Sequence, residues 1–197
     1  MFNRFVCKTL AFLLLAGVTV SAQANWYLDG ESSRLSFIST KKNANISEVQ
    51  RFLVLHGKVD PKGLAQVEVE LESINSGIPL RDERMRKELF EIQTFPEALI
   101  TTQIDLRPIN DLAPGAQLEL RLPLTVNLHG KQHRYNAELL ATRLDDRRFQ
   151  VVTLEPLVIS AEDFGLAPGL ESLRKVAGLS AISLSVPVGA VLIFTAR

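Results

Sequence analysis

The sequence predicts a mainly β protein in which about eight antiparallel strands form a closed barrel or a sandwich, accompanied by one or two short helices. Apolar and polar residues alternate along most of the chain, as they do in half-buried strands. Only two segments show a helical spacing instead, and turn motifs separate the alternating runs. Because the longest runs extend over roughly ten residues, they favour a strongly twisted barrel.

The first 24 residues are expected to be a secretory signal peptide rather than part of the fold. Two basic residues precede an apolar run from Leu10 to Val20, and the sequence Ser-Ala-Gln-Ala follows and ends at Ala24. This is the pattern that signal peptidase recognises, with cleavage after Ala24. An uncleaved membrane anchor is the alternative, but the run falls short of the ~20 residues of a spanning helix. We therefore expect an exported protein with a single domain over residues 25–197.

The composition argues against several classes of function. The chain has 22 Lys and Arg against 22 Asp and Glu, so it has no basic surplus for binding nucleic acid. Its one cysteine, Cys7, lies in the expected signal peptide, which excludes an internal disulfide, a CxxC redox motif and a thiolate-rich zinc site. No second long apolar run follows, so no membrane span is expected after cleavage.

The alternating runs define the expected strands in order. Their inward-facing residues are Leu35 and Phe37; Val67, Val69 and Leu71; Ile100, Thr102, Ile104 and Leu106; Leu118, Leu120, Leu122, Leu124, Val126 and Leu128; Ala137, Leu139 and Ala141; Val151 and Thr153; and Ile182, Leu184, Val186 and Val188. Turns are expected at 60–63, 113–115 and 130–131. Proline cannot donate to a ladder, so the longest strand is expected to bulge, or to lie at an edge, at Pro123.

Two helices are expected. From Arg81 to Phe95 the apolar residues recur at steps of four and three, and Pro96 is expected to end this helix. Three pairs of opposite charge lie four residues apart along it, namely Asp82 with Arg86, Arg84 with Glu88, and Lys87 with Glu91. The second helix is expected from Pro168 to Ala177, with Gly178 as its C-terminal cap.

No catalytic or metal-binding constellation is evident. His129 and His133 flank a predicted hairpin turn, so we interpret them as two surface histidines rather than as metal ligands, since no third ligand is in view. His56 lies near a strand end and is expected to be structural. The triplet 163–165 reads Asp-Phe-Gly, but the other kinase motifs are missing. These observations favour a binding protein over an enzyme.

Several motifs together resemble the YceI-like family. The most specific runs from Arg81 to Arg86 and continues with Leu89-Phe90-Glu91 and then Phe95-Pro96. The other matching motifs are Trp26-Tyr27-Leu28-Asp29, Ser33-x-Leu35-x-Phe37, Phe52-x-x-Leu55-x-Gly57, Leu124-Thr125 with Leu128-His129-Gly130, and Asp163-Phe164-Gly165. The resemblance implies an extended, lipocalin-like antiparallel β-barrel in the periplasm. Some family members hold a long isoprenoid chain or an isoprenoid quinone inside the barrel, and members are often dimers, which makes a homodimer conceivable here.

The resemblance suggests candidate site residues. Candidates for lining a ligand cavity are Leu35, Phe37, Phe52, Phe90, Phe95 and Phe164, and the alternative is that these residues simply fill the core. Arg81 or Arg86 could meet a polar head group at the barrel mouth. We favour the alternative that they belong to a structural ion-pair network in which Asp82 pairs with Arg86. Trp26 is expected to anchor the N-terminal strand by packing.

Three hypotheses for function follow. The first is a non-enzymatic periplasmic carrier that sequesters an isoprenoid or isoprenoid quinone, with no metal or redox cofactor of its own. The second is an enzyme acting on a lipid-like substrate in the same cavity, which would place an Asp, Glu or His with a perturbed pKa against the cavity. The third is an envelope protein with a structural or partner-binding role, whose barrel is filled by its own side chains and which carries an exposed apolar patch elsewhere.

Overall fold

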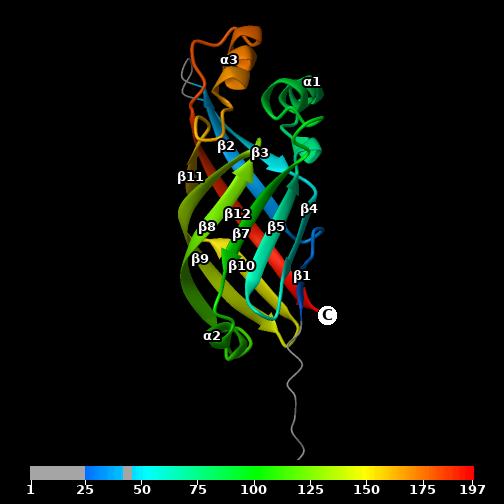
Figure 1. The fold of residues 1–197 in the computed structure, drawn as a ribbon, viewed down its shortest axis with the longest axis vertical. Helices are drawn as coiled ribbons and strands as arrows, with labels where there is room; N and C mark the ends of the chain where they lie inside the picture. The colour runs from blue at the N-terminus through cyan, green and yellow to red at the C-terminus, as the bar shows by residue number, and fades with distance from the viewer. Residues whose placement is uncertain (1–24, 42–45) are drawn as a thin grey trace, which may run out of the picture.

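The computed structural model describes residues 25–41 and 46–197 (Figure 1). The expected signal peptide, residues 1–24, lies outside the described residues. The strands are β1 (Trp26–Leu28), β2 (Arg34–Lys41), β3 (Ile46–Phe52), β4 (Leu55–Val59), β5 (Leu64–Glu70), β6 (Ile74–Asn75), β7 (Glu97–Gln103), β8 (Gln117–Leu128), β9 (Lys131–Asp145), β10 (Arg148–Thr153), β11 (Leu157–Ser160) and β12 (Ser185–Ala196). The helical segments are η1 (Leu71–Ser73), α1 (Pro79–Arg84), η2 (Met85–Leu89), α2 (Arg107–Asn110) and α3 (Ala167–Val176). None of the helices in the described ranges is long and apolar enough to cross a membrane.

Eight of the strands close into an antiparallel barrel. The hydrogen-bonded order is β1-β4-β5-β7-β8-β9-β10-β12, and β12 pairs back with β1 to complete the ring. The closing strand β1 is short, and its Trp26 packs edge-on against Phe149 with ring centroids 4.9 Å apart. The barrel prediction is therefore confirmed, and Trp26 anchors the closing strand by packing as expected.

The remaining strands extend one wall of the barrel. The first half of β12 pairs with β11 on one side and with β2 on the other, and β2 continues the sheet to β3 and β6. Figure 1 shows α1 and α3 at this extended end and α2 at the opposite end, which we call the base. The two ends of the barrel are thus covered by different helices.

The longest hairpin joins β8 to β9. His129 and Gly130 both have positive φ, 53° and 70°, which is the backbone of a two-residue hairpin turn that matches the strand twist. Pro123 pairs opposite Asn136 of β9, but the ladder between β8 and β7 ends at Thr125. Pro123 therefore lies where β8 has become an edge, as predicted.

The first helix differs from the prediction. It begins at Pro79, passes into the π-helical segment η2 and ends at Leu89, well before Pro96. The Phe90 N–H donates to the Met85 carbonyl at 2.9 Å, which widens the last turn, and Glu91 then adopts a φ of +48° that reverses the chain. The segment up to Phe95 is a turn, so the expectation that Pro96 ends the helix is wrong.

The second helix agrees with the prediction to within a residue. It is α3, and Gly178 follows it with a φ of +63°, as a C-terminal cap requires. Gly169 of α3 lies against η2: a Cβ at this position would come within 2.5 Å of the Glu88 carbonyl oxygen. This close approach, together with a hydrogen bond from Ser172 Oγ to Glu88 Oε2, joins the two helices at the extended end.

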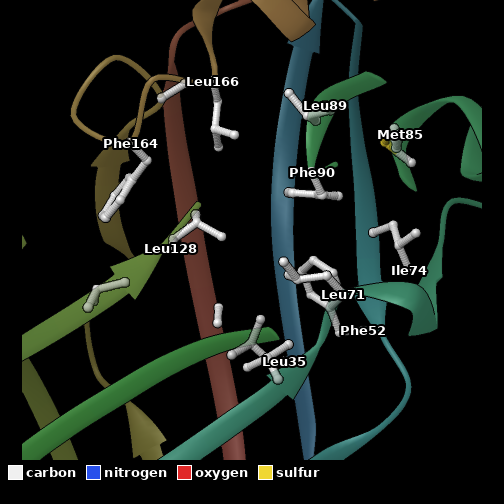
Figure 2. Packing of buried hydrophobic residues seen from close by; sticks show 14 of the residues in the cluster. Leu35, Phe52, Leu71, Ile74, Met85, Leu89, Phe90, Leu128, Phe164 and Leu166 are labelled. Atoms are coloured by element: carbon white, nitrogen blue, oxygen red, sulfur yellow. The ribbon is translucent and has the colours of Figure 1, made fainter. Parts of the chain in front are cut away.

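The buried core lies mainly between these helices and the extended wall. Phe164, Leu71 and Ile74 are its most fully buried large side chains. Figure 2 shows Phe52 and Leu71 side by side beneath Phe90, with Leu35 at the lower limit of this cluster. A second, smaller cluster around Phe194 lies lower in the barrel. The buried residues of this second cluster, Val59, Ala65, Val67 and Phe194, all line the cavity described next.

Candidate ligand cavity

The barrel encloses an apolar cavity of about 160 Å³. It is lined by inward-facing residues of most barrel strands, including Trp26 (β1), Val67 (β5), Ile100 (β7), Leu120, Leu122 and Leu124 (β8), Leu139 (β9), Phe149 and Val151 (β10), and Ala190, Leu192 and Phe194 (β12). It is smaller than the ~300–1,000 Å³ of typical ligand clefts, so a long ligand has to move side chains apart.

The burial pattern of β8 shows that the interior is incompletely filled. Leu120, Leu122 and Leu124 face the cavity, yet each remains only half-buried. The residues between them, such as Arg121, face outward and are exposed. Large leucines that point into a barrel without being fully buried have apolar surface available for a ligand.

Polar groups are scarce in this lining. Two hydroxyl groups contribute, and both are engaged by neighbouring strands: Thr102 Oγ1 donates to the Pro123 carbonyl at 3.0 Å, and Thr153 Oγ1 accepts from the Ala190 N–H at 3.2 Å. Among the described residues that line the cavity there is no Asp, Glu or His. The cavity therefore suits a hydrocarbon chain.

The base of the cavity is closed by the segment around α2. Leu106 and Ile109 of this segment contribute to the lining. Arg143 on β9 holds the segment in place, because its Nη1 donates to the carbonyls of Asn110 at 2.7 Å and Leu112 at 3.0 Å. The same guanidinium group lies 5.6 Å from the centroid of a cavity-lining ring, that of Phe149.

The candidate lining residues fall into two places. Leu35 lines the upper end of the cavity. Phe37, Phe52 and Phe90 form a chain of ring contacts above it, with centroids 5.6 Å and 5.8 Å apart, within the upper core. The structure thus brings these four residues together but places the three rings outside the cavity itself.

Phe95 and Phe164 lie elsewhere. The ring of Phe95 packs on His129 at 4.4 Å, against the hairpin turn. Phe164 is completely buried and contacts the rings of His133 and Tyr135 on β9. Both residues therefore pack where the upper half of β9 meets the turns at the extended end.

A hydrogen bond joins this part of β9 to the turn after β11. Tyr135 Oη donates to Asp163 Oδ2 at 2.9 Å, and His133 Nδ1 lies 3.8 Å from the same oxygen. Burial of the phenol, with a smaller contribution from the Asp163 carboxylate, raises the pKa of Tyr135 to about 12. The neutral phenol is the form that this contact requires.

The arginines of the motif around Arg81 have structural partners. Arg81 contacts Glu48 and donates to Ser76 Oγ and to the Ser76 carbonyl, both at 2.7 Å. Arg86 Nε donates to the Glu72 carbonyl at 2.7 Å. A hydrogen bond from Lys41, and a second one from Arg81, lower the pKa of Glu48.

The predicted pairing of Asp82 with Arg86 is wrong. The buried carboxylate of Asp82 accepts from the Ser76 N–H at 2.9 Å, and no ion pair with Arg86 occurs among the described residues. Asp82 instead accepts a bond at the start of the helix, and Arg86 is directed to the carbonyls of Glu72 and Ile74, at 2.7 Å and 3.3 Å.

The histidines also need one correction. His129 is not a surface residue: its side chain is only 14% exposed, and its Nε2 lies 3.4 Å from Glu91 Oε1. His133 is half-buried at the contact with Asp163. His56 of β4 contacts Glu70 of β5 diagonally across the two strands, with 2.9 Å between Nε2 and Oε1. Within the described ranges, no group of three or more His, Cys, Asp or Glu is placed to hold a metal ion.

Sequence reasoning recognised the leucine run of β8 as a strand but did not propose it as cavity lining. The signal was available, since this run places large leucines on one face of a strand with no aromatic residue among them. The closing segment around Ile109 had no comparable signal, because the sequence pattern predicts a continuous strand up to Leu106.

A closed antiparallel barrel with an apolar interior defines a ligand-binding barrel of the lipocalin type. The family model described as the YceI-like domain matches residues 26–193, and this chain belongs to the YceI-like family. No curated protein matches the sequence.

Two solved structures are similar to this chain. A polyisoprenoid binding domain from Saccharophagus degradans, implicated in plant cell wall breakdown, is 38% identical with a TM-score of 0.85, and the match covers 87% of this chain and 98% of that one. BcnA of Burkholderia cenocepacia is 18% identical with a TM-score of 0.64, covering 84% and 98% respectively, and supports the fold alone.

Proposed function

We propose that this protein is an exported, periplasmic carrier that sequesters an isoprenoid or isoprenoid-quinone-like ligand inside its barrel without transforming it. The observation that carries the proposal is the apolar cavity, whose two hydroxyl groups are already hydrogen-bonded within the sheet. Each Å² of apolar ligand surface removed from water contributes roughly 25 cal/mol. Electron chemistry, where the ligand is a quinone, belongs to the ligand.

The solved relative from Saccharophagus degradans supports this choice of ligand. It is described as a polyisoprenoid binding domain, and its match covers almost all of that chain. An isoprenoid is a slim, flexible hydrocarbon, which suits a narrow barrel interior. The half-buried leucines of β8 supply side chains that can move outward as the chain enters.

The first experiment identifies any natural ligand. The exported protein is purified, extracted with organic solvent and examined by mass spectrometry for one stoichiometric lipid, while native mass spectrometry reports whether it is a monomer or a homodimer. A defined isoprenoid at about one per chain supports the carrier. A protein that contains no lipid and also fails to take up added isoprenoids contradicts it.

The second experiment locates the binding site. Trp26 is the only tryptophan of the chain and lines the cavity, so its fluorescence reports ligand entry directly. Ala190→Phe fills the cavity from β12 and is expected to abolish the fluorescence change on titration with a polyprenol. Val191→Phe is the matched control, because Val191 is the next residue and is exposed on the outer face. Equal binding by both variants would place the ligand outside the barrel.

A further inference from the structure

A buried glutamine above the cavity has an unused hydrogen-bonding group. Gln50 of β3 is only 2% exposed. Its Oε1 is buried and has no hydrogen-bond partner among the described residues. Leaving such a group unsatisfied costs about 1–3 kcal/mol, and native proteins rarely retain one without a reason.

The register of the extended wall places Gln50 close to the cavity. Leu35, which lines the cavity, pairs opposite Phe52, and the next inward pair along the same two strands is Phe37 with Gln50. Two residues along a strand span roughly 6.6–6.8 Å. Phe37 therefore lies beside Gln50, and Phe52, whose ring packs on Phe37, is the one inward residue of β3 between Gln50 and the level of the cavity.

The next inward pair beyond Gln50 is Ser39 with Glu48, and the charge of Glu48 is neutralised by two cations. Glu48 contacts both Lys41, at 2.8 Å, and Arg81, and all three side chains are partly buried. Polarity thus rises along β2 and β3, from leucine through phenylalanine and glutamine to an ion-pair cluster. Both cations already share one carboxylate, so an anionic head group would have to compete with Glu48 for them.

We propose that Gln50 binds the head group of the ligand, and that this head group is an uncharged hydroxyl, as in an isoprenoid alcohol or a quinol. The inference rests on the proposed function. A free amide oxygen accepts a hydrogen bond, so it requires a donor, and a hydroxyl supplies one. The tail then extends past Phe37 and Phe52 into the cavity and toward α2. This arrangement orients the ligand with its head at the helical end.

The test compares ligands that differ only at the head. Wild-type protein, Gln50→Met and the control Gln132→Met, at an exposed position of β9, are titrated by Trp26 fluorescence with a polyprenol and with the hydrocarbon of the same chain length. Gln50→Met is expected to weaken polyprenol binding about 3- to 10-fold, the effect of one hydrogen bond, and to leave hydrocarbon binding unchanged. Gln132→Met is expected to behave like wild type with both ligands.

A change on the ligand side keeps the proposal testable should Gln50→Met fail to fold. The methyl ether of the polyprenol lacks the donor and is expected to bind wild-type protein as weakly as the hydrocarbon. An ether that binds as tightly as the alcohol, or a Gln50→Met variant that weakens both ligands equally, would overturn the role of Gln50. Wild-type protein that binds neither the alcohol nor the hydrocarbon would instead refute the proposed carrier function.

Discussion

At the scale of single residues, side chains close a seam that the backbone leaves open. The last pair between β9 and β10 joins Leu139 to Thr153, and β11 then pairs with β12 rather than with β9. The upper half of β9 is connected across this seam by the hydrogen bond from Tyr135 to Asp163 and by the ring of Phe164. Such a contact stabilises the barrel wall only while the phenol is protonated.

The seam predicts a specific dependence of stability on pH. Because the folded state raises the pKa of Tyr135 from 10.0 to about 12, its contribution is fully present below pH 10.0 and is lost as the pH rises toward about 12. Tyr135→Phe removes the hydrogen bond and is expected to lower the unfolding free energy by about 0.5–1.5 kcal/mol at neutral pH. Urea unfolding of both proteins from neutral to alkaline pH measures this difference. The difference should shrink in the alkaline range, and a constant difference would show that the folded state does not raise the pKa of Tyr135.

At the scale of elements, the two helices of the extended end pack through a glycine. Gly169 lets α3 approach η2 so closely that a Cβ would lie 2.5 Å from the Glu88 carbonyl oxygen and 2.9 Å from the Leu89 Cα. Both neighbours are backbone atoms, which cannot move aside as a flexible side chain can. Phe90, which directly follows η2, belongs to the upper core.

Gly169→Ala is therefore expected to destabilise the protein, although alanine ordinarily favours a helix by about 0.5–1 kcal/mol over glycine. The overpacking should dominate and lower the unfolding free energy by about 1–3 kcal/mol. Lys175→Ala, at an exposed position of the same helix, is the control and should change stability by less than about 0.5 kcal/mol. A stabilised Gly169→Ala variant in urea unfolding would show that α3 and η2 can separate at no cost.

The α2 segment predicts a limit on ligand length. Ile109 closes the base of the cavity, so Ile109→Ala should extend the cavity there and raise the affinity for longer polyprenols relative to shorter ones. Removing this buried side chain should also lower the unfolding free energy by about 2–5 kcal/mol. Titration of Trp26 fluorescence with polyprenols of increasing length measures the preference, and Asn110→Ala, at the exposed neighbouring position, is the control. An unchanged length preference would mean that the tail does not reach α2.

At the scale of the whole molecule, the sequence predicts the strands better than it predicts how they close into a barrel. The alternation along β8 and the turn at His129 and Gly130 are local properties, so both could be predicted. The closure of the ring depends on pairing between Trp26 of β1 and Ala196 of β12 at opposite ends of the chain, which periodicity does not encode. The backbone partners that Asp82 and Arg86 bind in place of one another, the Ser76 N–H and the Glu72 carbonyl, are equally invisible to a spacing argument.

The candidate site likewise contains residues that the sequence predicts and residues that only the folded chain reveals. Leu35 was proposed from the sequence and lies at the cavity. Phe37 lies opposite Gln50, and Phe52 lies one inward position nearer the cavity, so a ligand whose head group binds Gln50 has to pass both rings. Gln50 itself belongs to no motif. Its significance depends on burial and on a missing partner, which are properties of the folded chain.

The whole barrel also predicts how binding responds to salt. The described residues that line the cavity carry no charge, so the affinity for an isoprenoid should come from apolar burial rather than from ion pairing. Raising sodium chloride from about 0.1 M to about 1 M shortens the screening length from ~10 Å to ~3 Å, which weakens exposed ion pairs but leaves apolar burial intact. The dissociation constant from Trp26 fluorescence should therefore change by less than about twofold, and sulfate should tighten binding, because it strengthens apolar burial. A tenfold loss of affinity over this range would assign the binding to a charged surface instead, and the ion-pair cluster around Glu48 would be the first place to look.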